Sequence, residues 1–547
     1  MALGLSLLVL LTACGRIGYG PVSGDGGDVI PSDSSRDGAA DSGAPDSAGD
    51  AAACDVDGDG YAAISCGGVD CDDSNAAIAP GAEGPLGDAT CSDAIDNDCD
   101  GDIDGADSSC QPVDISPLGV AVRPILDPLQ GTFASGSDRV YFAGDDGSTG
   151  VELWVSDGTR AGTHLVHDVN PAGNSDPRHL RVASDKVFFF ADDGTNGLEL
   201  WVTDGTSAGT LMVRDIHPSG DGLRYHLPAL AGDLLVFQGD DGVNGREPWV
   251  SDGTAAGTHM IADLTPGAGG SQPYDMQTLD AGSVVFRANV APSGIELWRS
   301  DGTAAGTTLI ADANPGAGAS LPDGWFRYWG GADGVLYYRG TDGTNGLELW
   351  RTDGTEAGTL AVSDIEPGAG DGALGAPHPL VAGGRVFFTG TGPDGVEPYV
   401  SDGTPTSTRL LADLNPTGDS NVVDGTYQFT ESRGLVFFTA DDGMSGREPW
   451  VTDGSATGTR LLRDIRSTGA SDPYGLFSFR GELWFSADDG STGVELWKSD
   501  GTRANTVLAR DFNPGGDGIP FPIGVTASWV LLAADGGGTD GFLWVLR

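Results

Sequence analysis

From residue 111 to its end, the 547-residue chain repeats one phrase at intervals of 47 to 52 residues. The phrase reads VELWVSDGT from Val151 and LELWVTDGT from Leu198. Each copy is centred on an aromatic residue, and the centres are Trp154, Trp201, Trp249, Trp298, Trp350, Tyr399, Trp450, Trp497 and, in a truncated copy, Trp544. A repeat of this length restricts the chain to a solenoid, a propeller or a similar array of small supersecondary units.

Turn residues divide each unit into four short strands. In the second unit, an apolar run at residues 186–191 is followed by an Asp-Asp-Gly turn, and a second strand at 198–203 ends at Asp204 and Gly205. A third strand is predicted at 210–216, and a weaker fourth precedes the next apolar run. Four strands in such a unit are typical of a propeller blade, whose sheet packs on both faces. Packing on both faces explains why VFFF is apolar at consecutive positions.

The two ends of the repeat region complement each other. The final unit contains only its first two strands, while residues 113–117 match the third-strand phrase at 214–218. We therefore predict that the N-terminal piece completes the last unit and closes a ring without a free edge. The predicted fold is all-β, a single large propeller-like ring of about nine four-stranded repeats, with eight or nine blades. Two smaller rings and an open solenoid are the alternatives.

The repeated phrase resembles the ELWxxDGT repeat of large bacterial surface and secreted proteins. The resemblance covers residues 111–547 and implies a surface protein. It implies no particular reaction.

A Glu residue stands two positions before the aromatic centre in eight units, on the same strand face as that centre. These residues are Glu152, Glu199, Glu247, Glu296, Glu348, Glu397, Glu448 and Glu495. We interpret each as a latch between blades that accepts hydrogen bonds from backbone or Thr donors of the adjacent turn. The alternative is a ring of calcium or sugar sites, each built with the Asp of the neighbouring DGT turn.

The first 14 residues form an apolar run from Met1 to Leu11 that ends in the quartet LTAC. The run is too short to span a bilayer as a helix but suits an export signal, although no Lys or Arg precedes it. The quartet resembles the lipobox of bacterial lipoproteins, which implies lipidation, including palmitate, at Cys14. On this resemblance the protein is exported and anchored by lipid to the cell envelope, in the outer membrane or at the surface of a Gram-negative bacterium. The alternative is an apolar N-terminus with no such role.

Residues 15–53 consist almost wholly of Gly, Ala, Ser, Asp and Pro. Such a composition cannot form a core, so we predict a disordered acidic tether that reaches roughly 35 Å. Residues 54–110 contain every cysteine except Cys14, namely Cys54, Cys66, Cys71, Cys91, Cys99 and Cys110. In an exported segment this number indicates three disulfide bonds, chosen from fifteen pairings. A zinc cluster is the alternative, disfavoured because the segment has no His and no CxxC spacing.

The same segment contains two DxDxDG sequences, in which alternate carboxylates can converge on one hard cation. Its predicted calcium ligands are Asp55, Asp57, Asp59, Asp70, Asp72, Asp73, Asp96, Asp98, Asp100, Asp102, Asp104 and Asp107. The segment resembles the MopE-type metal-binding motif of bacterial surface proteins, a family linked to copper as well as calcium. Oxygen ligands and the absence of His and Met favour calcium. The alternative is that these Asp residues only form hydrogen-bonded turns in a disulfide-rich module.

Charge and motif content limit the function. A formal net charge of -52 excludes nucleic acid as a ready partner, because phosphate contacts would form against the protein's own field. The seven His residues are scattered over repeat positions, and Ser207 matches GxSxG only in a slot that varies between units. We therefore predict a non-catalytic, calcium-stabilised binding or adhesion scaffold, without organic cofactor, whose propeller face takes a glycan or protein ligand. A glycan-active propeller enzyme, a glycosidase or a lyase-like enzyme, is the alternative.

Overall fold

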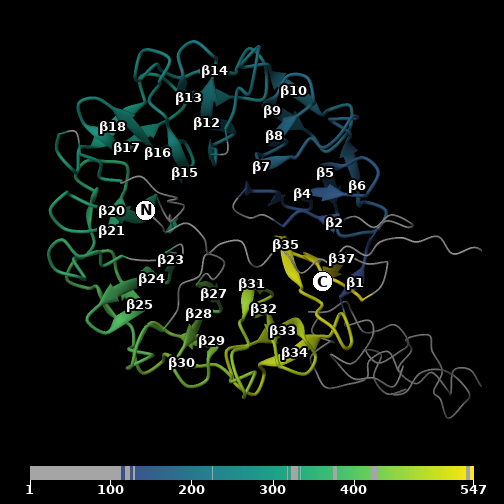
Figure 1. Cartoon of the computed structure of the whole chain (residues 1–547), viewed down its shortest axis with the longest axis vertical. Helices are drawn as coiled ribbons and strands as arrows, with labels where there is room; N and C mark the ends of the chain where they lie inside the picture. Colours follow the sequence, from purple (N-terminus) through teal and green to yellow (C-terminus); the bar gives the residue numbers. More distant parts are fainter. Residues whose placement is uncertain are drawn as a thin grey trace, which may run out of the picture.

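The computed structural model describes residues 112–116, 123–126, 130–224, 226–316, 318–321, 330–332, 334–373, 379–420, 429–537 and 542–547. The predicted signal segment 1–14, tether 15–53 and metal module 54–110 lie outside these residues. The described residues form strands, turns and bends without an α-helix, and the strands build nine antiparallel sheets that surround one axis (Figure 1). The protein is therefore a nine-bladed β-propeller.

The blades follow one another around the ring in chain order. Blade 1 contains β2 (Arg123–Pro124), β3 (Phe133–Ser135), β4 (Val140–Asp145), β5 (Val151–Ser156) and β6 (His164–His167). Blade 2 contains β7 (Arg178–Val182), β8 (Val187–Asp192), β9 (Leu198–Thr203) and β10 (Leu211–Arg214). Blade 3 contains β11 (Ala229–Ala231), β12 (Leu234–Asp240), β13 (Arg246–Ser251) and β14 (His259–Met260). Blade 4 contains β15 (Tyr274–Asp280), β16 (Ser283–Val290), β17 (Gly294–Ser300) and β18 (Thr308–Ala311). Blade 5 contains β19 (Gly330–Ala332), β20 (Val335–Gly340), β21 (Glu348–Thr352) and β22 (Leu360–Ala361).

The second half of the ring continues the pattern. Blade 6 contains β23 (Leu380–Ala382), β24 (Arg385–Gly392), β25 (Gly395–Ser401) and β26 (Arg409–Leu410). Blade 7 contains β27 (Thr430–Ser432), β28 (Leu435–Asp441), β29 (Arg447–Thr452) and β30 (Arg460–Leu461). Blade 8 contains β31 (Tyr474–Phe479), β32 (Glu482–Asp488), β33 (Val494–Ser499) and β34 (Val507–Arg510). Blade 9 contains β35 (Phe521–Val525), β36 (Val530–Ala533), β37 (Leu543–Leu546) and β1 (Val113–Asp114).

The strand that the sequence marks most weakly lies nearest the axis. In Figure 1, β7, β15, β31 and β35 stand on the inner side of their blades, and β10, β14, β18 and β34 on the outer side. Innermost strands of neighbouring blades contact one another, and β3 of blade 1 contacts both β7 and β35. Such contacts also join β11 to β15, β19 to β23, and β31 to both β27 and β35.

The N-terminal strand closes the ring as predicted. β1 pairs antiparallel with β37, so that Val113 lies opposite Val545 and Asp114 opposite Trp544. The backbone N–H of Ile115 then donates to the carbonyl of Leu543 at 2.9 Å. Closure at nine blades shows that the alternatives of two smaller rings and of an open solenoid are wrong.

Apolar side chains on both faces of each sheet hold the blades together. In β8, Phe188, Phe189 and Phe190 are at most 1% exposed. Phe188 and Phe190 belong to a cluster with Phe237 of blade 3. Phe189 packs on the opposite side with Leu153 of blade 1. Full burial of such a side chain contributes about 1.5–3 kcal/mol, so consecutive apolar residues in one strand stabilise two interfaces.

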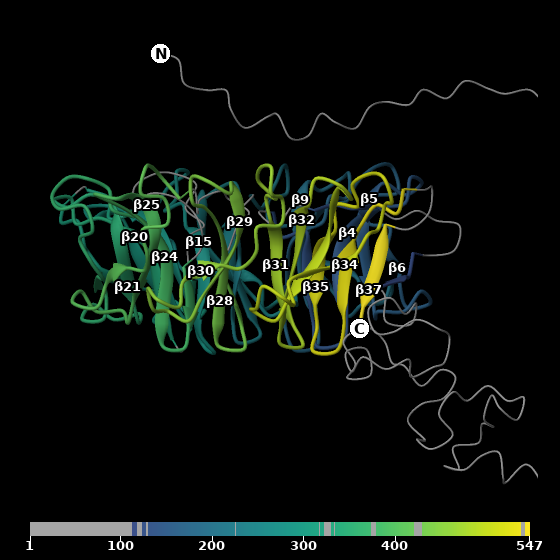
Figure 2. The same cartoon turned by 90° about the horizontal axis from the view of Figure 1, so that it is seen from below.

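The ring has two distinct faces. We count the strands of each blade from the axis outward, so that the strand with the Glu and the aromatic centre is the third. The DDG face contains the turns between the second and third strands, such as residues 145–150 between β4 and β5, and the loops that lead to the next blade, such as 168–177. The opposite DGT face contains the turns after the third strands, such as 157–163. Figure 2 views the ring from its side, and β37 ends at its lower edge, which is the DGT face.

Candidate functional site

The predicted latch position is a buried carboxyl that holds a loop between blades. Glu199 is the second residue of β9 and is 0% exposed. Its Oε1 accepts hydrogen bonds from the backbone N–H groups of Gly222 at 3.0 Å and His217 at 3.3 Å, and its Oε2 accepts one from Ile216 at 3.0 Å. These donors lie in the loop from blade 2 to blade 3. The carbonyl of Gly222 in turn accepts a bond from the N–H of Asp240 in blade 3. The loop is therefore fixed to both blades.

Seven further units repeat this arrangement. Their carboxyls are at most 1% exposed and accept bonds from residues 17 to 24 positions later, and they belong to Glu152, Glu247, Glu296, Glu348, Glu397, Glu448 and Glu495.

Burial raises the pKa of all eight carboxyls above its ordinary value, to about 7 for Glu199, Glu296, Glu348 and Glu495, although the N–H donors act in the opposite direction. At Glu199, repulsion from Asp215 adds to the effect of burial. Desolvation outweighs hydrogen bonding here because the charged form loses its water on folding.

The donors correct one detail of the latch prediction. Where a side chain donates, it is a Ser and not a Thr, as in the bond from Ser175 Oγ to Glu152 Oε2 at 2.6 Å. The alternative of a joint ligand site with the DGT turn is wrong. Glu152 lies at one end of β5 and Asp157 follows the other end, so about 16 Å of strand separates them.

The Asp side chain of each DGT turn accepts hydrogen bonds from its own turn. Asp204 Oδ1 accepts bonds from the hydroxyl of Thr206 at 2.7 Å and from its backbone N–H at 2.8 Å. The Thr206 hydroxyl, followed by its N–H, holds the pKa of Asp204 below its ordinary value. A Cβ on Gly209 would lie 2.2 Å from the same oxygen. In blade 8 this position is Asn505, whose Nδ2 donates to Asp500 Oδ2 at 2.6 Å. These carboxylates therefore shape turns.

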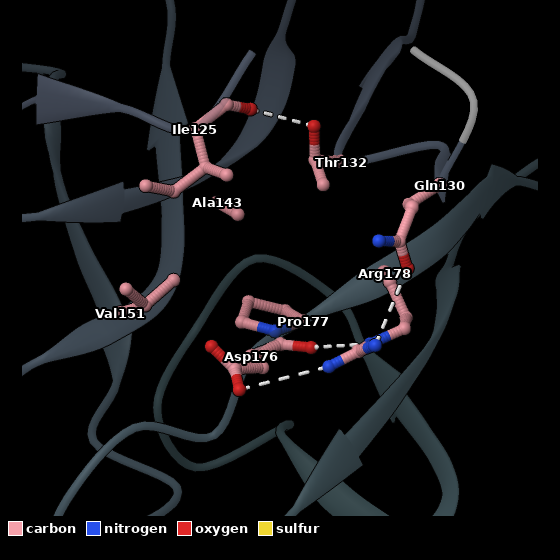
Figure 3. Close-up of a pocket in the computed structure, with 8 residues that line it drawn as sticks. All are labelled: Ile125, Gln130, Thr132, Ala143, Val151, Asp176, Pro177 and Arg178. Atoms are coloured by element: carbon pink, nitrogen blue, oxygen red, sulfur yellow. Dashed lines mark hydrogen bonds and ion pairs between the residues drawn. The ribbon is translucent and has the colours of Figure 1, made fainter. Parts of the chain in front are cut away.

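A cavity of about 240 Å³ lies between blades 1 and 2 on the DDG face (Figure 3). It is lined by Ile125, Gln130, Thr132, Ala143, Val151, Asp176, Pro177 and Arg178. Arg178 Nε donates to the carbonyl of Asp176 at 3.0 Å, and Arg178 Nη1 donates to Gln130 Oε1 at 3.3 Å. Arg178 Nη2 lies 3.6 Å from Asp176 Oδ2. The cavity is smaller than most sites for drug-sized molecules, and its charged groups contact each other. A second cavity of about 240 Å³ lies between blades 6 and 7 and includes Arg385 and Asp453.

A charged and aromatic cluster lies where blade 3 meets blade 4. Arg287 Nε is 2.9 Å from Asp275 Oδ2, and the two side chains are 8% and 12% exposed. The guanidinium lies over the ring of Tyr274, 5.1 Å from its centroid, and the ring of His226 is 4.3 Å from the same ring. Asp275 adopts a φ of 53°, which is uncommon for a residue other than Gly. The buried ion pair fixes this conformation at the start of β15.

The Ser of the GxSxG match lies in an exposed turn between β9 and β10. Ser207 Oγ is 2.8 Å from His167 Nδ1 of blade 1. The position of His167 is taken in blade 2 by Arg214, whose Nη1 donates to the carbonyl of Thr258 in blade 3 at 2.7 Å. The His–Ser pair is thus one member of a series of contacts between adjacent blades, which agrees with Ser207 as a turn residue.

The predicted lipidation, disulfide and calcium residues all lie outside the described residues. These are Cys14, the six cysteines from Cys54 to Cys110 and the twelve Asp residues from Asp55 to Asp107. Within the described ranges, no group of three or more His, Cys, Asp or Glu side chains is arranged to hold a metal ion. The same part of the chain forms no helix with the length and apolar character needed to cross a bilayer.

No family model and no curated protein matches the chain. Solved structures with a similar fold include puromycin hydrolase, at 14% identity and a TM-score of 0.34, over 65% of this chain and 58% of that chain. The β-propeller domain of the Trilobed protease from Pyrococcus furiosus matches at 13% identity and a TM-score of 0.31, over 61% of this chain and 98% of that chain. The chain thus spans little more than half of the first of these proteins. At such scores the likeness carries no argument about activity.

Sequence analysis missed the residues that begin the inner strands. Four of these positions follow a shared phrase with proline, and they are Arg178, Tyr274, Tyr474 and Phe521. In each case the register shifts soon after, as between Arg178 and Arg181 in β7. The signal is SDPR, SQPY, SDPY and IPF in the sequence, and the last residue of each phrase stands 26 or 27 positions after the latch Glu.

Proposed function

We propose that this protein is a lipid-anchored cell-surface protein whose propeller is a non-catalytic binding or adhesion scaffold. The latch network carries the proposal. Eight Glu residues that repeat around the ring are buried and bonded to the loops between blades, so their role is to hold a rigid disc. The Asp residues of the DGT turns accept bonds from their own turns. The most regular acids of the ring thus support the fold.

The residues that differ between blades supply the recognition surface. The inner strands β7, β15, β31 and β35 begin with Arg178, Tyr274, Tyr474 and Phe521, which are all partly exposed on the DDG face. Neighbouring side chains hold Tyr274 and Arg178 in place, and rigid aromatic groups that are partly exposed provide contact area with little loss of side-chain entropy. A glycan or a protein surface is therefore the class of ligand that this face suits.

The N-terminal segments attach this disc to the membrane through a module that calcium stabilises. Cys14 carries the lipid, and residues 15–53 separate the disc from the membrane. Residues 54–110 hold calcium with oxygen ligands from the two DxDxDG sequences, with Asp96, Asp98 and Asp100 at alternate positions of the second. Removal of calcium is expected to loosen this module and not the ring, because the latch carboxyls are held by backbone N–H groups and Ser hydroxyls of the ring.

Screening the full chain against immobilised glycans and surface proteins, with and without EDTA, tests the scaffold function. Binding without chemical change of the ligand supports the proposal, and turnover of any glycan contradicts it. Tyr474→Ala should weaken binding, whereas Met444→Ala, at an 88% exposed tip of the same face, is the matched control. Equal effects of the two variants would show that the inner strands do not bind the ligand.

Two further measurements test the attachment. Cys14→Ala should release the protein from membranes, and unchanged association would contradict the lipid anchor. Calorimetric titration of the full chain with calcium should show binding that Asp98→Asn weakens. The absence of both heat and a thermal shift would contradict the calcium module.

A further inference from the structure

The cavity between blades 1 and 2 lies where the innermost position of blade 1 is divided between two strands. In each of the other eight sheets, one of the described strands occupies this position. In blade 1, β2 pairs with Gly144 and Asp145 at the DDG end of β4, and β3 pairs with the residues from Val140 to Phe142. Ala143, between these two pairings, lines the cavity. The pattern of the repeat is therefore interrupted at the wall of this cavity.

Hydrogen bonds hold both sides of the interruption in place. The N–H of Ile125 donates to the carbonyl of Ala143 at 2.8 Å, and the N–H of Ala143 donates to the carbonyl of Thr132 at 2.7 Å. The Thr132 hydroxyl donates to the carbonyl of Ile125 at 2.6 Å. From blade 2, the N–H of Leu180 donates to the carbonyl of Gly131 at 3.0 Å. The cavity is thus formed by backbone that is fixed within blade 1 and to blade 2.

The two sides of the cavity differ in polarity. Figure 3 shows Ile125 and Val151 on one side and Gln130 and Arg178 on the other. On the polar side, Arg178 donates to Gln130 Oε1 at 3.3 Å, and its Nη2 lies 3.6 Å from Asp176 Oδ2. The side chains of Arg178 and Asp176 are 15% and 52% exposed, so guanidinium donors and carboxylate acceptors stand side by side within reach of solvent.

Size and charge restrict the ligand. A volume of about 240 Å³ is below the roughly 300–1,000 Å³ of most small-molecule sites, so the cavity admits one small ring or chain end. The ion pair offsets the charges of Arg178 and Asp176. The hairpin beside the cavity carries adjacent acids at 145–146, and Asp145 pairs with Val151 across it. These acids oppose an anionic ligand and the guanidinium opposes a cationic one, so the cavity favours a neutral group.

We propose that this cavity binds one neutral sugar unit at the end of a glycan. A hydroxyl group both donates and accepts hydrogen bonds, so adjacent sugar hydroxyls donate to Asp176 and accept from Arg178. The C–H face of the sugar ring lies against Ile125 and Val151. This assignment rests on the proposed binding function and names a ligand class and a place for it on the DDG face.

Saturation-transfer NMR of the full chain with methyl glycosides tests the site. The probes are the neutral methyl glycosides of glucose, galactose, mannose and N-acetylglucosamine, with glucuronic acid and glucosamine as charged counterparts. At least one neutral glycoside should bind, and more tightly than either charged sugar. Arg178→Met should weaken this binding by about tenfold or more, the loss of one hydrogen bond to a charged group. Ala143→Leu, which fills the cavity, should abolish it.

Two variants elsewhere in the ring are the controls. Arg385→Met changes the second cavity, which has the same volume of about 240 Å³ and lies between blades 6 and 7. Tyr474→Ala changes the inner strand of blade 8 on the DDG face. Both should bind the single sugar as the unchanged protein does, and thermal unfolding of each variant verifies that it is folded.

The outcomes separate the cavity from the scaffold function. Unchanged binding by a folded Arg178→Met variant, an equal loss in Arg385→Met, or tighter binding of glucuronic acid than of the glucoside would overturn the assignment. If no sugar binds while a protein ligand does, the cavity assignment is wrong and the scaffold stands. Turnover of a glycan that depends on Arg178 would contradict the non-catalytic scaffold and retain the cavity as a sugar site.

Discussion

Removal of one latch carboxyl is the sharpest test of how the ring is held together. Glu199→Ala leaves the backbone N–H groups of Ile216, His217 and Gly222 without their acceptor. These three residues belong to the loop that connects blade 2 to blade 3. The loop lies so close to Glu199 that a Cβ on Gly222 would be 2.6 Å from Glu199 Oε1.

The expected magnitude follows from these three bonds. An unpaired buried donor costs about 1–3 kcal/mol, and water that enters the vacated space recovers part of this. A total loss of about 3–6 kcal/mol is therefore expected. Unfolding entropy of about 2.1 cal/mol/K per residue over the roughly 430 residues of the ring amounts to about 0.9 kcal/mol/K. Cooperative unfolding would then lower Tm by about 3–7 °C.

Amide hydrogen exchange and thermal unfolding measure the effect. The exchange of Ile216 and Gly222 should accelerate at least about a hundredfold, since about 1.4 kcal/mol corresponds to a factor of ten. Glu356→Ala is the matched control, because Glu356 is an exposed Glu in a turn of the DGT face. An unchanged exchange rate at both amides, with a Tm equal to that of the control, would refute the latch.

The same carboxyl makes stability depend on pH. Burial raises the pKa of Glu199 from its ordinary value of 4.5 to about 7. The folded ring thus favours the protonated form, so the contribution to stability is fully present below pH 4.5 and is lost as the pH rises to about 7. Glu199→Gln keeps one acceptor oxygen but places an amide NH₂ against one set of donors. It should destabilise less than Ala and flatten the pH dependence between these values.

Three further predictions concern separate parts of the ring. Gly209→Ala should change the stability in thermal unfolding by less than about 1 kcal/mol, because the new Cβ meets only the movable carboxylate of Asp204 and Asn505 takes the same position in blade 8, and a loss of several kcal/mol would contradict this tolerance. Arg160→Ala removes the bond from Arg160 Nη2 to the carbonyl of Asp114 at 2.9 Å, and faster exchange of the Ile115 amide would report a weaker closure, with no change at Leu200. Asp275→Asn removes the carboxylate charge 2.9 Å from Arg287 Nε and should cost about 3–5 kcal/mol, while the double change with Arg287→Met should recover much of that stability, and a double variant no more stable than Asp275→Asn would contradict a buried pair.

The repeat predicts most of the fold because every unit contains the same pattern of strands and turns. The period, the turn residues and the doubly apolar strand at Phe188–Phe190 together require sheets stacked on both faces. The match between 113–117 and 214–218 predicts closure, and β1 pairs with β37 accordingly. The latch Glu could be inferred from its constant place beside Trp201. Backbone donors were part of that prediction, but the Ser donor and the position of the donors in the loop to the next blade, 17 and 23 or 24 residues later, could not be inferred, because nothing in the repeat shows which part of the next blade lies beside the Glu.

The positions of the inner strands could not be predicted from the sequence, for a physical reason. Inner strands such as β11 and β27 have three residues and carry no strong period, because they are partly exposed near the axis. Their positions are set by neighbouring blades. The φ of 47° at Asp176 and of 53° at Asp275 are likewise imposed by the loops and by packing, since sequence alone favours neither. The residues that distinguish one blade from another therefore lie where the repeat gives the least guidance.

The acids behind the net charge of -52 differ in burial and in position on the folded ring. The latch carboxyls are buried, and burial raises their pKa, so part of the formal charge is not expressed in the folded ring below pH about 7. The DGT-turn carboxylates have a lowered pKa because their own turns donate to them, and exposed arginines lie on the same face. More exposed arginines lie on the DGT face than on the DDG face, so the DDG face is the more negative of the two, although ion pairs such as Arg178–Asp176 offset part of its charge. A ligand that binds there must be neutral or cationic, or must reach the inner-strand aromatic residues through this field, and raised salt should strengthen the binding of an anionic glycan and leave that of a neutral one unchanged.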